Sequence, residues 1–132
     1  MLVDTNVISE LARRKPDPAV TTWAAAVPLP LAVSVVTLEE IHFGLTWRPN
    51  AQVRAWFDDF FAKSCTVLPV TDAIAKRAGE LRGQLRAAGR QRTHADMLVA
   101  STAQAHQLTL VTRNVRDFEG CGITVVNPFA AP

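Results

Sequence analysis

Short apolar runs alternate along the chain with longer segments in which apolar residues recur every three or four positions. The short runs predict strands, and the periodic segments predict helices. The continuous apolar run 31–35 is typical of a strand that is covered on both faces. In the segment 72–88, the steps of three and four residues from Ile74 to Leu85 predict a long helix. The alternation of the two patterns indicates an α/β protein.

Local signals set the bounds of these elements. Thr37 and Asn50 are residue types that cap helix N-termini, Pro18 suits a first helical turn, and Gly89 suits a helix end. The predicted strands cover residues 1–3, 31–35, 66–70, 108–111 and 123–126, and the predicted helices cover 5–11, 18–26, 37–46, 51–62, 72–88 and 93–106. This order predicts a compact parallel sheet flanked by helices on both faces.

The length of the chain limits its organisation and its compartment. With 132 residues, 48% of them hydrophobic, residues 1–132 suffice for one packed core and are too few for two ordinary domains. Asp4 interrupts the opening apolar residues, which argues against a signal peptide. The longest apolar stretch, 24–36, contains two prolines and is too short to cross a bilayer. We therefore expect one soluble, cytoplasmic domain that has no membrane partner.

Cysteine content and net charge exclude some classes and leave others open. Cys65 and Cys121 lie far apart, with no Cys or His at zinc-ligand spacing, so neither a disulfide framework nor a zinc ribbon is predicted. The net charge of +2 and the pI near 8.8 are compatible with a nucleic-acid partner but do not require one. The placement of the charges is therefore more informative than their sum.

Four carboxylates stand at the edges of the predicted core elements. Only 12 of the 132 residues are acidic, and carboxylates are normally solvated. The four are Asp4 after the first strand, Glu40 near the start of the helix after the second, Asp96 in the first turn of the 93–106 helix, and Asp117 in the segment after the 108–111 strand. Because function in open α/β sheets collects at the carboxyl ends of the strands, we expect these side chains to share one rim.

Such a group of oxygen ligands points to a cation. Mg²⁺ prefers octahedral oxygen coordination and is usually held by one or two protein carboxylates together with waters and substrate phosphates. Without a cation, neighbouring carboxylates would repel one another and some would take up protons. A magnesium site of this kind suits the activation of water and the hydrolysis of a phosphodiester.

Three of these residues also have ordinary structural interpretations. Asp4 stands where a helix N-cap would stand. Asp96 follows Thr93 by three residues, which is close to the spacing of a capping box. Asp117 has the residue type that fixes a turn together with Asn114. Each residue taken alone is therefore weak evidence for a metal site.

Glu40 is harder to explain as a surface residue. It lies within a helical segment that is largely apolar, from Leu38 to Leu45. Its neighbour Glu39 is the better candidate for solvent exposure, although the two assignments are interchangeable on the sequence alone.

Four ordered motifs give this pattern a family resemblance. They are MLVDTNVISEL at 1–11, SVVTLEEIHFG at 34–44, ADMLVASTA at 95–103 and LVTRNVRDF at 110–118. They resemble the PIN-domain family and, within it, the VapC and FitB type of toxin. The likeness runs nearly end to end and includes the closing Asn-Pro-Phe at 127–129.

The resemblance implies a single PIN domain that is an endoribonuclease dependent on Mg²⁺, with Mn²⁺ as a substitute. It also implies a toxin that is neutralised by a cognate antitoxin protein, and a homodimer. Asp4 and Asp96 match the principal metal ligands of the family, and Glu40 matches the acidic residue of its second motif. The metal held by these three carboxylates would activate water for attack on an RNA phosphodiester.

The fourth acidic position is open between two residues. Some relatives have an aspartate where this chain has Asn114, whereas others share the Thr-Arg-Asn-x-x-Asp pattern that ends here at Asp117. Thr5, Asn6 and Thr112 resemble the polar residues that orient the carboxylates and water in the family. Simple helix capping explains the same three residues equally well.

RNA binding requires positive charge along the path of the backbone. Arg113 and Arg116 flank the site segment and are the expected contacts for RNA or for an acidic antitoxin. Arg82 and Arg86, four residues apart on a helix, are interpreted as a solvated stripe. For the dimer contact, exposed apolar residues of the helices 51–62 and 74–85 are the expected surface.

Two other function classes remain open on the sequence. An aspartyl-phosphate phosphohydrolase would use Asp4 as its nucleophile, but its second aspartate is replaced by Asn6 and the chain is short for that fold. A binding module without metal would contact RNA or protein and not cut it. Cleavage assays with substitutions at Asp4 and Asp96 distinguish these classes.

Overall fold

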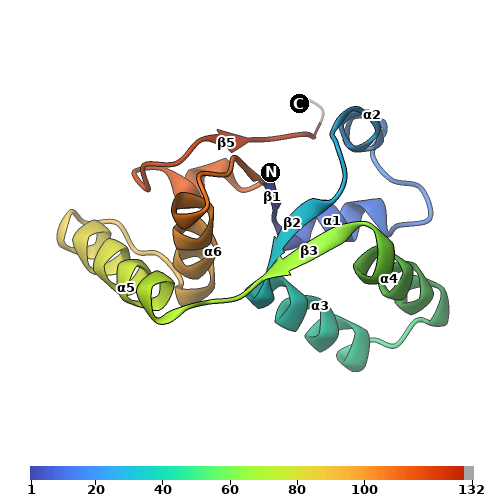
Figure 1. The fold of residues 1–132 in the computed structure, drawn as a ribbon, viewed down its shortest axis with the longest axis horizontal. Coiled ribbons are helices and arrows are strands. Elements are labelled where there is room, and N and C mark those ends of the chain that lie inside the picture. Colours follow the sequence, from blue (N-terminus) through green and yellow to red (C-terminus); the bar gives the residue numbers. More distant parts are fainter. Residues whose placement is uncertain (130–132) are drawn as a thin grey trace.

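The computed structural model describes residues 1–129 and contains a five-stranded sheet in the order β3-β2-β1-β4-β5 (Figure 1). The strands are β1 (Leu2–Val3), β2 (Leu31–Ser34), β3 (Cys65–Leu68), β4 (Leu110–Val111) and β5 (Val125–Val126). All four strand pairs are parallel. The α/β class and the parallel sheet predicted from the sequence are confirmed.

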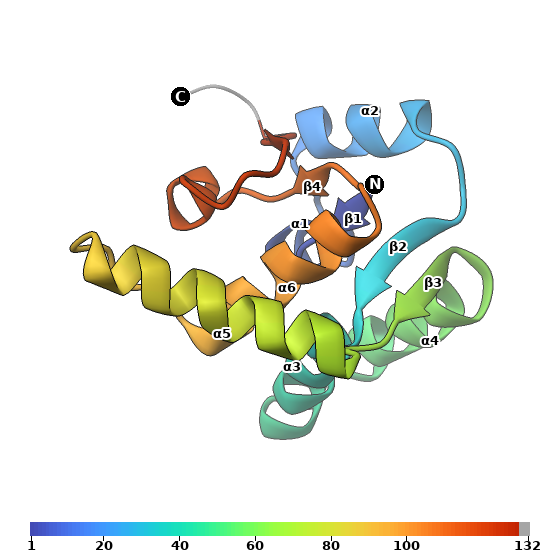
Figure 2. The same cartoon turned by 60° about the vertical axis from the view of Figure 1, so that its left-hand side comes forward.

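Six α-helices connect and cover these strands. They are α1 (Thr5–Leu11), α2 (Pro18–Ala26), α3 (Val35–Trp47), α4 (Ala51–Lys63), α5 (Asp72–Ala87) and α6 (His94–Ala105), and a 3₁₀ turn, η1 (Val115–Phe118), follows β4. Figures 1 and 2 show α5 and α6 together on one side of the sheet, and α1 and α4 on the other. Among residues 1–129, no helix is long and apolar enough to cross a membrane.

Two hydrophobic clusters hold these layers together. Successive side chains of a strand point to opposite faces, so Leu2 and Leu110 join the cluster formed with α5, α6 and Phe118. Their chain neighbours Val3 and Val111 join the cluster formed with α1, α2, α3 and α4. The four strand residues are fully buried. The central strands are therefore apolar on both faces, as the continuous apolar runs predicted.

The start of α3 differs from the prediction. The helix begins at Val35, and its N-cap is Ser34, whose hydroxyl accepts a hydrogen bond from the Val36 amide at 3.1 Å. The prediction that Thr37 caps this helix was wrong, because Thr37 is fully buried inside its first turn. The β-branched pair Val35–Val36 favours a strand locally, but the strand-to-helix turn at Ser34 overrides that preference.

The part of the expected dimer surface that lies on α5 is contradicted by the structure, and the part on α4 stays a prediction. The apolar residues of α5, including Ile74 and Leu85, are buried in the core of the chain. The most exposed large aromatic side chains of residues 1–129 are Phe43 and Trp47 of α3, which are 61% and 65% exposed. An apolar stripe at helical spacing marks a core-facing surface more often than a subunit interface, and α5 follows that rule.

We predict that Phe118→Ala lowers the free energy of unfolding by about 3–5 kcal/mol. Phe118 is 2% exposed and fastens η1, which carries Asp117, to the cluster around α6. Phe43→Ala is the matched control, because the same truncation at an exposed site costs within about 0.5 kcal/mol. Urea unfolding followed by circular dichroism measures both variants, and equal losses would contradict the core assignment.

Candidate active site

Asp4 lies directly after β1, and its carboxylate is the best-connected polar group of the rim. It is only 7% exposed. The Thr112 hydroxyl donates to its Oδ2 at 2.8 Å, the Asn6 amide donates to the same oxygen at 3.2 Å, and the Thr5 backbone N–H donates to Oδ1 at 2.8 Å. Asp4 is also the N-cap of α1, so the capping role considered for it is real and coexists with its position at the rim.

The side chains around Asp4 bind one another as well. Asn6 donates to Thr112 Oγ1 at 3.2 Å and accepts from the Arg113 backbone N–H at 3.0 Å. The Asn114 backbone N–H donates to Thr112 Oγ1 at 3.1 Å. These bonds connect the start of α1 to the segment after β4. They fix the orientation of the Asp4 carboxylate from both neighbouring elements.

Glu40 reaches the same region from α3. The Thr5 hydroxyl donates to its Oε1 at 2.7 Å, while the Thr5 backbone binds Asp4. Thr5 therefore bridges the two carboxylates. Glu39 is exposed, whereas Glu40 is half-buried, so the orientation expected for the pair is the one observed.

Asp96 lies in the first turn of α6, whose N-cap is Thr93. The Thr93 hydroxyl accepts from the Asp96 backbone N–H at 3.1 Å. Burial raises the pKa of the Asp96 carboxyl, a hydrogen bond with Thr93 opposes that rise, and the charges of Asp4, Asp117 and Glu40 add to it. The pKa of Asp96 thus responds to all three other carboxylates of the predicted site.

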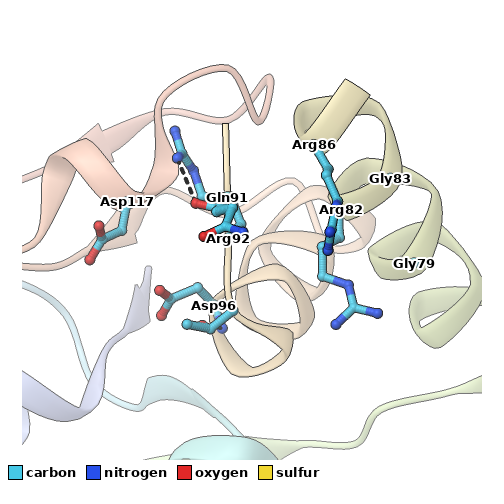
Figure 3. A pocket seen from close by; sticks show the side chains of 9 residues that line it. Gly79, Arg82, Gly83, Arg86, Gln91, Arg92, Asp96 and Asp117 are labelled. Carbon is cyan, nitrogen blue, oxygen red and sulfur yellow. Dashed lines mark hydrogen bonds between the residues drawn. The ribbon is translucent and has the colours of Figure 1, made fainter. Parts of the chain in front are cut away.

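Asp96 and Asp117 line a groove of about 570 Å³ (Figure 3). Glu40 and Thr5 line a second groove of about 380 Å³. Within residues 1–129, no three His, Cys, Asp or Glu side chains are already close enough to hold one ion between them. The four acidic residues are therefore near one another without forming a closed set of ligands.

Three arginines line the same groove as Asp96. Arg82 and Arg86 reach it from α5, and Arg92 reaches it from the segment before α6 (Figure 3). Arg92 also donates from Nη2 to the backbone oxygens of Arg116 and Glu119, at 3.4 and 3.3 Å. The interpretation of Arg82 and Arg86 as a solvated stripe omits this groove, which both residues line.

The arginines expected to contact the substrate lie elsewhere. The Arg113 guanidinium stands over the ring of Phe129, 4.6 Å from its centroid, beside a separate groove that Glu10 and Lys15 also line. Arg116 is exposed, and its backbone oxygen is the group that accepts from Arg92. Neither side chain lines the groove of Asp96 and Asp117.

The donor set fits a hard divalent cation. Asp4 and Asp96 offer carboxylate oxygens. Burial of Asp96 and the charges of Asp4, Asp117 and Glu40 around it make its charged form unfavourable in the absence of a cation. Mg²⁺ needs only one or two protein carboxylates when water and substrate oxygens complete its coordination. The Cys121 thiol does not compete for the cation, because it is buried against Met97 in the core.

Comparison with known proteins places this geometry in a family. The sequence matches the model of the PIN domain over residues 1–120. The chain belongs to the PIN-domain family. The five-stranded parallel sheet with helices on both faces is therefore the PIN fold that the motifs implied.

Relatives of this PIN domain span its full length. It is 33% identical to the VapC ribonuclease Y4jK of Sinorhizobium fredii, over 98% of this chain and 97% of that protein. It is 28% identical to the toxin FitB of Neisseria gonorrhoeae, over 98% of each. A chain in the structure of a toxin-antitoxin complex from Klebsiella pneumoniae is 27% identical, with a TM-score of 0.76 and 98% of both chains covered.

We predict that Asp96→Asn raises the melting temperature of the metal-free protein at neutral pH by a few degrees. The raised pKa of Asp96 means that its charged form is disfavoured in the folded state. This penalty is complete above the folded-state pKa and disappears once the pH falls below the ordinary value of an aspartate, where both states bind the proton. Thermal unfolding of both proteins in EDTA, from neutral to acid pH, measures this penalty. The difference in melting temperature between Asp96→Asn and the wild type should shrink towards low pH.

Asp4→Asn provides the opposite control. Its carboxylate accepts three hydrogen bonds, and the amide cannot accept all of them. We expect this variant to have a free energy of unfolding about 1–3 kcal/mol lower than that of the wild type. Its melting temperature in the same buffers should therefore be lower. Melting temperatures that change in the same direction in Asp4→Asn and Asp96→Asn would contradict this contrast between a well-bonded carboxylate and a disfavoured one.

Proposed function

We propose that this PIN domain is an endoribonuclease, dependent on Mg²⁺ or Mn²⁺, that acts as the toxin of a toxin-antitoxin pair. The observation that carries the proposal is a set of four carboxylates from four separate elements at one rim of the sheet, in which Asp4, Glu40 and Asp117 all act on Asp96. Relatives over the whole chain include a VapC ribonuclease and a toxin. A carboxylate rim of this kind, opposite a wall of arginines, suits an anionic substrate that is cut with the help of a cation.

In this proposal Asp4 and Asp96 hold the cation, and Glu40 assists them through Thr5. A bound divalent cation supplies an activated water and neutralises charge on the phosphodiester. Thr112, Asn6 and Thr5 keep the Asp4 carboxylate in one orientation, so little reorganisation is needed when the cation enters. The catalytic group is thus Asp4, Glu40, Asp96 and Asp117, with none of the three histidines required.

For the fourth acidic position we favour Asp117 over Asn114. Asp117 lines the groove with Asp96, and its charge raises the pKa of that residue. Asn114 acts through its backbone N–H, which donates to Thr112. The Arg92 contacts with the backbone of residues 116 and 119 hold the turn that carries Asp117.

Asp117→Asn should therefore lower the rate of RNA cleavage by about 10–100-fold, the range found when groups around a metal site are altered. Asn114→Ala should lower it by less than about threefold, because the backbone N–H remains. Initial rates on one RNA, with each variant at equal folded concentration, compare the two. A larger loss for Asn114→Ala would transfer the role to that residue.

The proposed partners follow from the relatives. The similar Klebsiella pneumoniae chain comes from a toxin-antitoxin complex. We propose that this chain likewise binds a cognate antitoxin, and that it is a homodimer within that assembly. Mixing the purified chain with the small protein encoded beside its gene, followed by light scattering, tests both points.

The proposed activity is tested with purified protein that is free of antitoxin. It should cleave RNA with Mg²⁺ or Mn²⁺ and not in EDTA, and Asp4→Asn and Asp96→Asn should each lose at least about 100-fold. Asp58→Asn is the matched control, because Asp58 is exposed on α4 and outside both grooves. Mass spectrometry of the cleavage mixture checks Asp4 for covalent phosphate.

Three results would overturn the proposal. Full cleavage activity in both Asp4→Asn and Asp96→Asn would show that these carboxylates are not the catalytic site. Phosphate bound covalently at Asp4 would favour a phosphohydrolase, and RNA binding without cleavage under either metal would favour a binding module.

A further inference from the structure

A stripe of two glycines and two arginines runs along α5 on the wall opposite the carboxylates. Gly79, Arg82, Gly83 and Arg86 follow the spacing i, i+3, i+4 and i+7, which places them on one face of the helix. All four line the groove that also holds Asp96 and Asp117 (Figure 3). We call these four residues the α5 stripe.

The arginines of the α5 stripe are unneutralised. The ion pairs found in residues 1–129 join Arg13 to Glu10 and Lys63 to Asp59, and neither involves the groove. Arg82 forms a hydrogen bond between its Nη1 and Nε2 of His94 at the start of α6, and this partner has no negative charge that could neutralise the guanidinium. Two like charges at i, i+4 destabilise a helix by about 0.2–0.5 kcal/mol. The helix itself therefore gives no reason for placing Arg82 and Arg86 side by side.

The glycines of the α5 stripe carry a similar cost. Each glycine in a helix interior costs about 1 kcal/mol relative to alanine. A Cβ added at Gly79 or Gly83 would meet no atom within 4 Å. Packing therefore does not require them to be glycine. Their effect is to leave the helix surface low between the arginines, open to close approach by another molecule.

We propose that the α5 stripe binds the sugar-phosphate backbone of single-stranded RNA and guides it to the carboxylates. The inference rests on the proposed function and names the substrate contact of the same groove. Arg82 and Arg86 pair with successive phosphates, and Gly79 and Gly83 let the backbone lie against the helix. A groove of about 570 Å³ has the size of a site for a small organic molecule, which suits one strand and not a duplex.

A second copy of this chain is the competing occupant of the α5 stripe. Glycines four residues apart also allow two helices to pack closely. A two-fold contact through this face would, however, bring Arg82 and Arg86 of both copies together with no carboxylate on the stripe to neutralise them. The positive charge of the α5 stripe therefore favours a polyanion as its occupant over a second copy of the chain.

The test measures the affinity of the full chain for a short fluorescent single-stranded RNA in EDTA, where cleavage does not interfere. The double variant Arg82→Gln/Arg86→Gln should weaken binding about tenfold and reduce the slope of log affinity against log salt by about 1.4, which is two phosphates at about 0.7 each. The charge-matched control is Arg14→Gln/Arg54→Gln, which removes the same number of charges outside the groove. It should bind as the wild type does, since Arg14 and Arg54 are both exposed and neither lines the groove. Affinity of the double variant equal to that of the control overturns the proposal.

The variant Gly83→Ala distinguishes an effect on RNA affinity from an effect on the stability of the fold. The alanine should raise the melting temperature, because it removes the helix cost without a clash. It should nevertheless weaken RNA binding about threefold, because the new methyl group narrows the approach to the helix. A more stable variant that binds RNA as well as the wild type would contradict the role of the glycine.

Two further measurements keep this inference distinct from the proposed function. Cleavage by the wild type with Mg²⁺ tests the function alone, so loss of binding in the arginine variant supports the α5 stripe even if no cleavage occurs. Light scattering reports the oligomeric state of each variant. A changed mass together with unchanged RNA affinity would assign the α5 stripe to a contact between copies and overturn its role in binding RNA.

Discussion

The hydrogen bonds of the Asp4 carboxylate are the constraint on which the rim depends. A carboxylate that is 7% exposed must be well paired, since an unpaired buried charge is expensive. Its partners come from the first turn of α1 and from Thr112 after β4, which are far apart in sequence. Satisfying this one group therefore fixes the relative position of two neighbouring strand ends. It also sets where Glu40 lies, because Thr5 binds both carboxylates.

The groove divides its charges between two walls. Carboxylates from α6 and η1 form one wall, and Arg82 and Arg86 from α5 form the other, while Arg92 binds the turn that carries Asp117 (Figure 3). Simple stability would favour ion pairs across the groove, yet within residues 1–129 none of its arginines makes a salt bridge. Both walls are thus left with unfavourable local electrostatics. Strain of this kind is usual at functional sites, where the missing counter-charges arrive with the ligands.

The sequence predicted the fold well because local and tertiary preferences agree in most elements. Asn50 and Thr93 cap helices as expected, and the apolar runs are buried on both faces. The prediction failed at Ser34, where a β-branched pair enters a helix. The four acidic residues were found from their positions at strand and helix ends. The role of Arg82 and Arg86 in the groove could not be predicted in the same way, because a charged stripe on a helix has the same sequence pattern whether it faces solvent or a groove.

The place of β1 in the sheet has a consequence for how the rim forms during synthesis. This strand comes first in the chain but lies in the centre of the sheet, where it pairs with β2 and with β4. Its second partner is made more than a hundred residues later, so the contact between Asp4 and Thr112 closes one of the longest loops of the fold. A growing chain cannot complete the rim until β4 has left the ribosome. The carboxylates therefore come together only when nearly the whole domain exists, and shorter nascent chains lack the assembled site.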